Sequence, residues 1–220
     1  MAEVLITLGI IGIVAAMTLP ALLNKADEYV RLQQFKKVYN TLNNALARSF
    51  ADNGGYYYVC YYGQNKNFTE CENLLNDLKK ILNIIKVCED NALRNGCVSP
   101  EMKGFDTVRD REPDLSDEEW EDYSKRNCGG FMEANIKTRN PAWVLPDGSI
   151  IGFYGPEFSQ LFWVDINGLK GPNKWGYDIF GFLFYNEGNS LVKVVPMGKG
   201  SCACVEKGGR SGEGILKMMY

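Results

Sequence analysis

The chain has 220 residues, of which 45% are hydrophobic, and a formal net charge of −3. This length and apolar content predict one anchor helix and one globular domain with a core of its own, and the weakly acidic balance gives no sign of a nucleic-acid partner. The absence of histidine excludes Ser-His-Asp triads, Cys-His nucleophile pairs and His-containing metal sites. Because no pair of carboxylates suggests separate acid and base roles either, we expect a protein that is not an enzyme.

The N-terminal segment is an uncharged run of twenty residues, Val4 to Leu23. As a helix that rises about 1.5 Å per residue, it would measure roughly 30 Å, which is the thickness of the hydrocarbon core of a bilayer. A removed signal peptide is a weaker interpretation, because a basic start, a short apolar core and a small-residue cleavage site are not clearly present. The run is therefore predicted to span a membrane.

Four residues in and around this run have a spacing that is typical of one family. Glu3 stands at its head, Gly9 and Gly12 lie inside it, and Pro20 lies near its end. This arrangement resembles the N-terminal helix of type IV pilins and of the pseudopilins of type II secretion.

The resemblance implies a function, partners and a location. The chain is expected to be a structural subunit that assembles through its apolar helix, with copies of itself or sibling pilins, into a type IV filament or a secretion pseudopilus. A prepilin peptidase, an inner-membrane platform and an assembly ATPase are the further partners it implies. The subunit would lie in the cytoplasmic membrane before assembly, with its head extracytoplasmic, and in a cell-surface filament or a periplasmic pseudopilus afterwards. The sequence does not separate these two assemblies.

The resemblance also implies roles for the four residues. The carboxylate of Glu3 would meet the N-terminal amine of a neighbouring subunit, and a buried acid with one available cation disfavours every other register. Gly9, Gly12 and Pro20 match the place where such helices unwind or bend in a filament, although the glycines could equally be close-packing contacts. The basic leader of the family is missing before Met1, so the sequence is expected to be a fragment.

A function of a different class stays open. The chain could be a single-pass, membrane-anchored, extracytoplasmic domain that binds a ligand through residues 56–68 or through the loop 164–180. The first of these segments is rich in tyrosine, for which packing around a disulfide is the favoured use. Glu3 would be dispensable for this function.

Seven cysteines follow the predicted anchor: Cys60, Cys71, Cys88, Cys97, Cys128, Cys202 and Cys204. Their number favours disulfides in an oxidising compartment, with one thiol left over, and the absence of a C-x-x-C pair disfavours zinc. Short loops make Cys60 with Cys71, and Cys88 with Cys97, attractive pairs, and Cys128 could reach Cys202 or Cys204. The connectivity stays open.

The apolar pattern continues beyond the predicted membrane span at intervals of three and four residues, through Leu32, Phe35, Tyr39, Leu42, Leu46 and Phe50. One helix is therefore predicted from residue 3 to residue 51. Residues 1–24 form its transmembrane or filament-core part and residues 25–51 an amphipathic continuation. Asp52 to Gly55 are predicted to end this helix. Residues 52–220 are then predicted to form a globular, disulfide-containing α+β head.

Two capping boxes predict helices in the first half of the head. Thr69 with Glu72 precedes an amphipathic pattern at 70–87, and Ser116 with Glu119 opens a short acidic helix to Lys125. The acids in this second helix invite a cation-binding interpretation, but solvated residues that suit a helix N-terminus are favoured.

From Ala142 onwards the period changes to that of strands. Residues 142–145 and 149–154 read as a hairpin, and residues 159–166, 178–185 and 191–195 as three further strands of an antiparallel sheet. The predicted fold class is therefore α+β, with the long N-terminal helix packed on an antiparallel sheet in a pilin-like layout. Residues 198–220 are expected to be an edge strand or a loose tail.

The loop 164–180 resembles a D-x-N-G-x-x-G-P-N loop found in many pilin-like heads. Asp165, Asn167 and Asp178 offer three oxygen ligands, so Ca²⁺ binding is chemically feasible, although Lys170 stands where an EF-hand needs glycine. Turn-fixing hydrogen bonds from these side chains to their own backbone are the favoured alternative. No other cofactor or metal is expected.

Overall fold

The computed structural model describes residues 2–58, 60, 70–111, 115–126, 128–155, 160–186, 192–199 and 201–219, without the side chains of 2–10, 110–111, 122–124, 186 and 192. The helices are α1 (Ala2–Asp52), α2 (Cys71–Ile81), α3 (Asp117–Ser124), α4 (Glu133–Thr138) and α5 (Gly212–Met219), and short 3-10 helices lie at η1 (Val108–Arg111) and η2 (Gly129–Phe131). The strands are β1 (Lys86–Cys88), β2 (Ala142–Val144), β3 (Ile150–Phe153), β4 (Leu161–Asp165), β5 (Ile179–Asn186) and β6 (Val192–Pro196). The fold is α+β, as predicted.

The strands form one antiparallel sheet in the order β1-β2-β3-β4-β5-β6. Because spatial order equals chain order, each strand pairs with the next one along the chain. The predicted hairpin is β2 and β3, joined by the turn at Pro146-Asp147-Gly148, with Trp143 opposite Ile151. The later predicted strands correspond to β4, β5 and β6.

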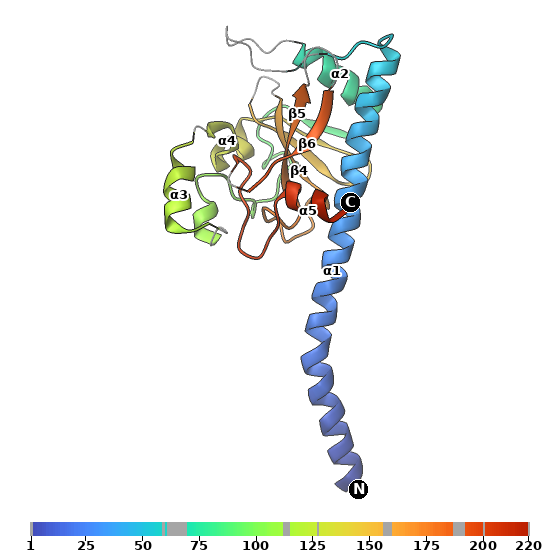
Figure 1. Cartoon of the computed structure of the whole chain (residues 1–220), viewed down its shortest axis with the longest axis vertical. Coiled ribbons are helices and arrows are strands. Elements are labelled where there is room, and N and C mark those ends of the chain that lie inside the picture. The colour runs from blue at the N-terminus through green and yellow to red at the C-terminus, as the bar shows by residue number, and fades with distance from the viewer. Residues whose placement is uncertain are drawn as a thin grey trace.

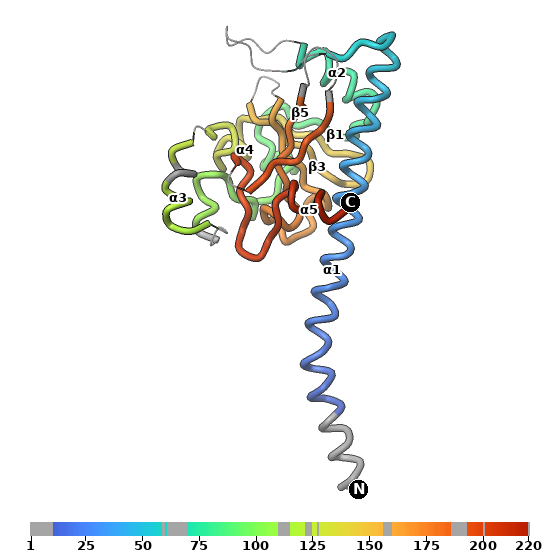
Figure 2. Tube along the Cα trace, in the orientation of Figure 1, coloured from blue at the N-terminus to red at the C-terminus, as the bar shows by residue number. Residues whose placement is uncertain are grey.

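Helix α1 is continuous over 51 residues, and Pro20 lies inside it. Its C-terminal half runs along the head, whereas residues 11–23 extend beyond the head with no other described element beside them (Figures 1 and 2). The predicted helix from 3 to 51 is confirmed, and so is its stop. Gly54 and Gly55 take positive φ angles of 68° and 86°, and the Gly55 amide donates to Phe50 O at 2.9 Å, as expected of a helix end.

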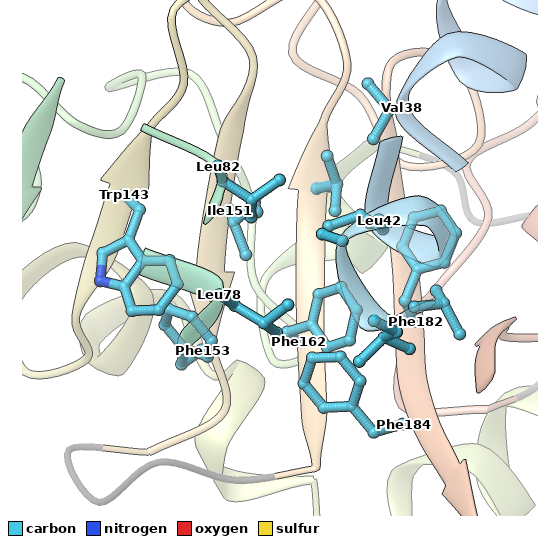
Figure 3. Packing of buried hydrophobic residues seen from close by; sticks show 14 of the residues in the cluster. Val38, Leu42, Leu78, Leu82, Trp143, Ile151, Phe153, Phe162, Phe182 and Phe184 are labelled. Carbon is cyan, nitrogen blue, oxygen red and sulfur yellow. The ribbon is translucent and has the colours of Figure 1, made fainter. Parts of the chain in front are cut away.

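The amphipathic half of α1 buries one face against the sheet. Phe35, Val38 and Leu42 are almost fully buried, and the ring of Phe35 packs edge-on against Phe180 with centroids 4.9 Å apart. Figure 3 shows this cluster with Leu78 and Leu82 beside the strand residues Trp143, Ile151, Phe153, Phe162, Phe182 and Phe184. Each large apolar side chain buried here contributes about 1.5–3 kcal/mol.

The opposite face of the sheet is also covered, by segment 89–111, η2 and α4. Along β4, Phe162 and Val164 face α1 while Trp163 between them belongs to the second cluster, because successive side chains of a strand point to opposite faces. The sheet is therefore buried on both sides, and α1 forms an outer layer.

The predicted helix at 70–87 is too long. Helix α2 ends at Ile81, Asn83 takes a left-handed φ of 51°, and residues 86–88 form β1, which pairs with β2. Pairing with the edge of the sheet offers these residues ladder hydrogen bonds that a longer helix would forgo. Thr69 lies outside the described residues.

The expectation of an edge strand or a loose tail at the C-terminus is wrong. Residues 212–219 form α5, opened by a hydrogen bond from the Gly214 amide to Ser211 Oγ at 3.1 Å. Ile215 and Met219, four residues apart on one helical face, join the cluster under α1. Packing on β5 and β6 thus explains the helix.

The second predicted capping box is present. The Glu119 amide donates to Ser116 Oγ at 3.2 Å, and the Ser116 amide donates to Glu119 Oε2 at 2.8 Å. Helix α3 accordingly begins at Asp117 and ends at Ser124, one residue before the predicted end at Lys125.

Candidate functional site

The part of α1 outside the head is an exposed apolar segment, residues 11–23. Its large side chains keep between 51% and 75% of their surface exposed: Ile11, Ile13, Val14, Met17, Leu19, Leu22 and Leu23. Of the four residues matched to the pilin family, Gly12 and Pro20 lie in this segment, and a Cβ at Gly12 would meet no atom within 4 Å. Glu3 and Gly9 lie where side chains are not described.

Within the residues that could be searched, no helix combines the length and the apolar character needed to cross a membrane. Residues 4–10 of the predicted span lie among those without described side chains.

The predicted loop between β4 and β5 is held by its own carboxylates. Asp165 Oδ1 accepts a hydrogen bond from the Asn167 amide at 3.2 Å. Asp178 accepts from the Asn173 amide at 2.8 Å and from the Lys174 amide at 2.7 Å. These are the hydrogen bonds of the turn-fixing alternative, and they keep both carboxylates in place at the ends of two paired strands.

Both carboxylates are buried, Asp165 with 3% and Asp178 with 0% of its surface exposed. Burial, together with the negative charge of Asp178, raises the pKa of Asp165 well above its usual range. Burial also raises the pKa of Asp178, against hydrogen bonds from Lys174 and Asn173 that lower it. The pair is therefore electrostatically strained when both groups are ionised.

A bound cation would relieve this strain, so the Ca²⁺ hypothesis keeps a physical basis. Asn167 Oδ1 is buried without a hydrogen-bond partner in the described part of the chain, although that part contains no group of three or more Cys, Asp or Glu side chains that could hold a metal. Titration of Ca²⁺ into the full chain in neutral detergent tests the hypothesis. An unchanged melting temperature would end it, because a ligand bound only by the folded state raises that temperature.

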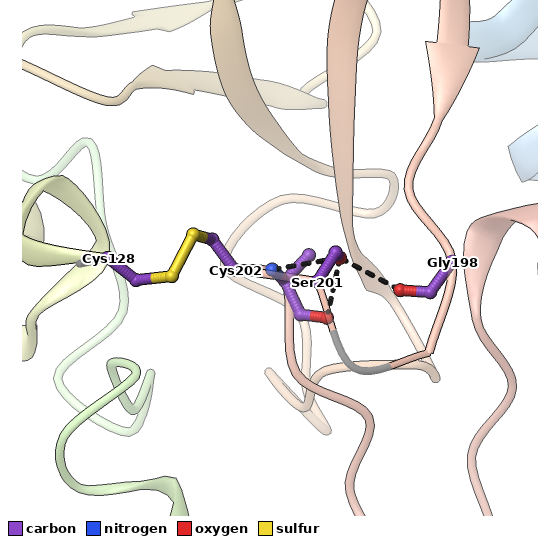
Figure 4. The surroundings of a disulfide bond; sticks show 5 residues. Cys128, Gly198, Ser201 and Cys202 are labelled. Carbon is purple, nitrogen blue, oxygen red and sulfur yellow. Dashed lines mark hydrogen bonds between the residues drawn. A yellow bond between two sulfur atoms is a disulfide. The ribbon is translucent and has the colours of Figure 1, made fainter. Parts of the chain in front are cut away.

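The cysteines form three disulfides. Cys60 pairs with Cys71 and Cys88 with Cys97, as the short loops favoured, and Cys128 pairs with Cys202. Ser201 helps to fix the turn that carries Cys202: its hydroxyl donates to Gly198 O at 2.8 Å and accepts from the Ala203 amide at 3.3 Å (Figure 4).

The seventh cysteine, Cys204, is a buried thiol. It points into the cluster on the sheet face opposite α1, and its Sγ lies 3.9 Å from Val205 O. Cys202, two residues earlier, forms the disulfide with Cys128, so Cys204 is the thiol that the three disulfides leave over.

The described part of the tyrosine-rich segment packs against the end of α1. The ring of Tyr57 stacks on Phe50 with centroids 4.0 Å apart, and the hydroxyl of Tyr56 donates to the Glu70 carboxylate at 2.8 Å. Cys60, which follows, is bonded to Cys71. Packing around a disulfide, the favoured use, accounts for these residues, and residues 61–69 lie outside those described.

A groove that the sequence did not predict lies where α1 leaves the head. It has a volume of about 870 Å³ and lies between residues 24–32 of α1, the turns at 172–177 and 208–210, and α5. We call it the basal groove. Its walls come from segments up to about 190 residues apart, so no local pattern could have revealed it. The one sequence signal nearby was Lys25, which follows the apolar run after a single residue.

No protein-family model matches the chain, and no curated protein or solved structure is significantly similar to it.

Proposed function

We propose that the chain is a structural subunit of a type IV filament or a secretion pseudopilus. The observation that carries the proposal is the exposed apolar segment at residues 11–23, on a helix that is continuous with the part buried in the head. Contiguous apolar surface of this kind marks a region that lipid or another protein covers.

The hydrophobic effect favours covering residues 11–23 with lipid or with another protein. Complete burial of one large apolar side chain contributes about 1.5–3 kcal/mol. The seven side chains expose 51–75% of their surface, so covering it provides roughly 6–13 kcal/mol for insertion into lipid or for packing against neighbours. The same surface can serve both states, because lipid tails and apolar helices offer comparable surroundings. A subunit could thus pass from the membrane into a filament core with its apolar surface covered in both.

The head and this segment share one continuous helix. Phe35 and Leu42, further along this helix, are buried against the sheet, so the helix leaves the head from a fixed position. A long helix packed on an antiparallel sheet is also the layout that the resemblance to pilins implies. Together these features support a subunit whose heads repeat regularly around a helical core.

The residues matched to the family take specific roles in this proposal. Glu3 neutralises the N-terminal amine of a neighbouring subunit, and Gly9, Gly12 and Pro20 form the stretch that bends or packs closely in the filament. The open space around Gly12 supports close approach by a second helix. The peptidase, platform and ATPase of such systems, and location in the cytoplasmic membrane and then in a filament or pseudopilus, belong to the same proposal.

The decisive variant is Glu3→Ala, with Glu72→Ala as a control because Glu72 is an exposed carboxylate on α2. Immunogold electron microscopy of cells, with an antibody against residues 52–220, measures assembly. We expect gold along fibres or in short envelope-bound assemblies for the wild type and the control, and dispersed gold for Glu3→Ala.

Unchanged assembly of Glu3→Ala would contradict the proposal. Gold dispersed over the envelope for all three proteins would favour the membrane-anchored ligand-binding domain instead.

A further inference from the structure

The basal groove carries an excess of positive charge. Lys25, Arg31, Lys174 and Arg210 line it, against the two acids Asp27 and Glu28. Arg210 and Glu28 pair with each other, with Nη2 and Oε1 2.7 Å apart. Within the described residues, the other three cations form no ion pair, and Asp27 is the one remaining acid among the residues that line the groove.

Two of these cations are held at one point of the groove. The guanidinium of Arg31 lies 5.5 Å from the centre of the Tyr177 ring, and the Lys174 ammonium lies 5.9 Å from it. The hydroxyl of Tyr177 donates to Lys207 O at 2.8 Å, which fixes the ring. An aromatic face attracts cations but does not neutralise them, so both charges stay available to an anion.

The groove also has apolar walls. Leu32 of α1 and Ile215 of α5 line it, and Met218 lines it with half of its surface exposed. A ligand that fits must combine a negative charge with apolar portions. Such surroundings suit the phosphate and glycerol region of a lipid better than a fully hydrated anion.

The location of the groove selects the source of that ligand. Lys25 follows the exposed apolar segment after a single residue, and Arg31 lies about 9 Å further along the helix at 1.5 Å per residue. If the segment is inserted in a bilayer, these positions coincide with the headgroup layer, just outside the hydrocarbon core. The groove then faces lipid phosphates from the moment of insertion.

We propose that the basal groove binds the phosphate of an anionic phospholipid headgroup, with Arg31 and Lys174 as its principal cations and Lys25 at its membrane edge. This inference rests on the proposed function, since it places the apolar segment in a membrane. It adds a specific lipid site on the head to a non-specific apolar anchor. A bound headgroup would orient the head relative to the bilayer before assembly.

The test uses the full chain in neutral detergent micelles that contain either phosphatidylglycerol or phosphatidylcholine at equal mole fractions. Thermal unfolding is compared for the wild type, for Arg31→Gln combined with Lys174→Gln, and for a control with two exposed head lysines replaced, Lys80→Gln with Lys86→Gln. We expect phosphatidylglycerol to raise the melting temperature of the wild type and the control. The groove variant should lose most of this rise. Each cation removed lowers the affinity for the lipid about fivefold, roughly 25-fold for the two together.

Three outcomes would overturn the proposal: equal effects of the two lipids on the wild type, an unchanged phosphatidylglycerol effect in the groove variant, and a shift of the same size with inorganic phosphate alone. The last would assign the groove to a free anion, and the first would leave an acidic protein segment as its occupant. Because Arg31→Gln also removes the contact with Tyr177, each protein is compared with itself in the two lipids. Arg31→Lys should retain the lipid effect.

The outcome is separable from that of the assembly experiment. Unassembled subunits in micelles suffice, so Glu3→Ala should keep the phosphatidylglycerol effect while it loses assembly. Loss of both in Glu3→Ala would point to a disturbed head instead.

Discussion

Asp165 and Asp178 show how single residues hold the head together at a cost in free energy. Each carboxylate accepts backbone N–H groups that fix the loop between β4 and β5, but each is buried beside the other. The pKa of Asp165 is raised by burial and by the charge of Asp178. A carboxyl with a raised pKa binds more protons in the folded than in the unfolded chain, so stability falls as pH rises from about 3.9 through the raised value.

We therefore expect Asp165→Asn to gain stability relative to the wild type as pH rises from about 4 to 7, because asparagine cannot ionise. The gain is about 1.4 kcal/mol for each unit by which the pKa is raised. Urea unfolding of both proteins in neutral detergent at several pH values measures it. A pH-independent difference would show that Asp165 titrates normally.

Asp147 is expected to have the opposite effect on the pH dependence of stability. Burial alone would raise its pKa, but hydrogen bonds from Ser149 and Lys37 outweigh burial and lower it. The stability that Asp147 contributes is present above the usual carboxyl pKa and is lost as pH falls through the lowered value. Asp147→Asn should therefore lose stability relative to the wild type as pH rises through the acidic range.

At the scale of elements, the contact between α1 and the sheet connects anchor and head. Phe35 is completely buried, packs edge-on against Phe180 and lies 5.7 Å from Phe182 between ring centres. These rings come from β5, in the middle of the chain's second half. The position of α1 therefore depends on a few large side chains at the point where it enters the head.

Phe35→Ala is expected to destabilise the protein by about 3–5 kcal/mol, because it removes a buried ring and leaves a cavity. Tyr29→Ala is the matched control on the same helix: Tyr29 is 64% exposed, and its removal should change stability by less than about 0.5 kcal/mol. Urea unfolding in detergent measures both. Similar losses for the two variants would contradict the packing of α1 against β5.

At the scale of the whole molecule, the disulfide between Cys128 and Cys202 closes the longest covalent loop. Its cysteines are 74 residues apart, so the bond ties the segment after α3 to the turn that precedes α5. The other two disulfides, with separations of 11 and 9 residues, brace local loops. A long loop restricts the unfolded chain most.

We expect Cys128→Ala to cost about 2–5 kcal/mol, and Cys204→Ala on the order of 1 kcal/mol, since only a small buried group is lost. Cys128 is replaced rather than Cys202 because Cys204 could substitute for its neighbour. Unfolding under non-reducing conditions, with peptide mapping of the intact bonds, measures both effects. Equal losses for the two variants, with Cys128 mapped to Cys204 in the wild type, would identify Cys204 as the native partner of Cys128.

The sequence by itself determined the features that depend on neighbouring residues. The spacing of Leu32, Phe35 and Leu42 predicted the buried face of α1, and the reciprocal positions of Ser116 and Glu119 predicted the start of α3. The short separations favoured two disulfides in the same way. In each case the residues that carry the signal lie close together along the chain, so their spacing was sufficient for the prediction.

Only the tertiary structure decided the features that join distant segments. Residues 86–88 form a strand because β2 offers them partners, and residues 212–219 form a helix because β5 and β6 offer it a surface. The choice of Cys202 over Cys204, the shared burial of Asp165 and Asp178, and the basal groove follow from contacts between elements far apart in the chain. Local sequence patterns do not report the free energy of such contacts, because these contacts form only when the sheet and α1 come together.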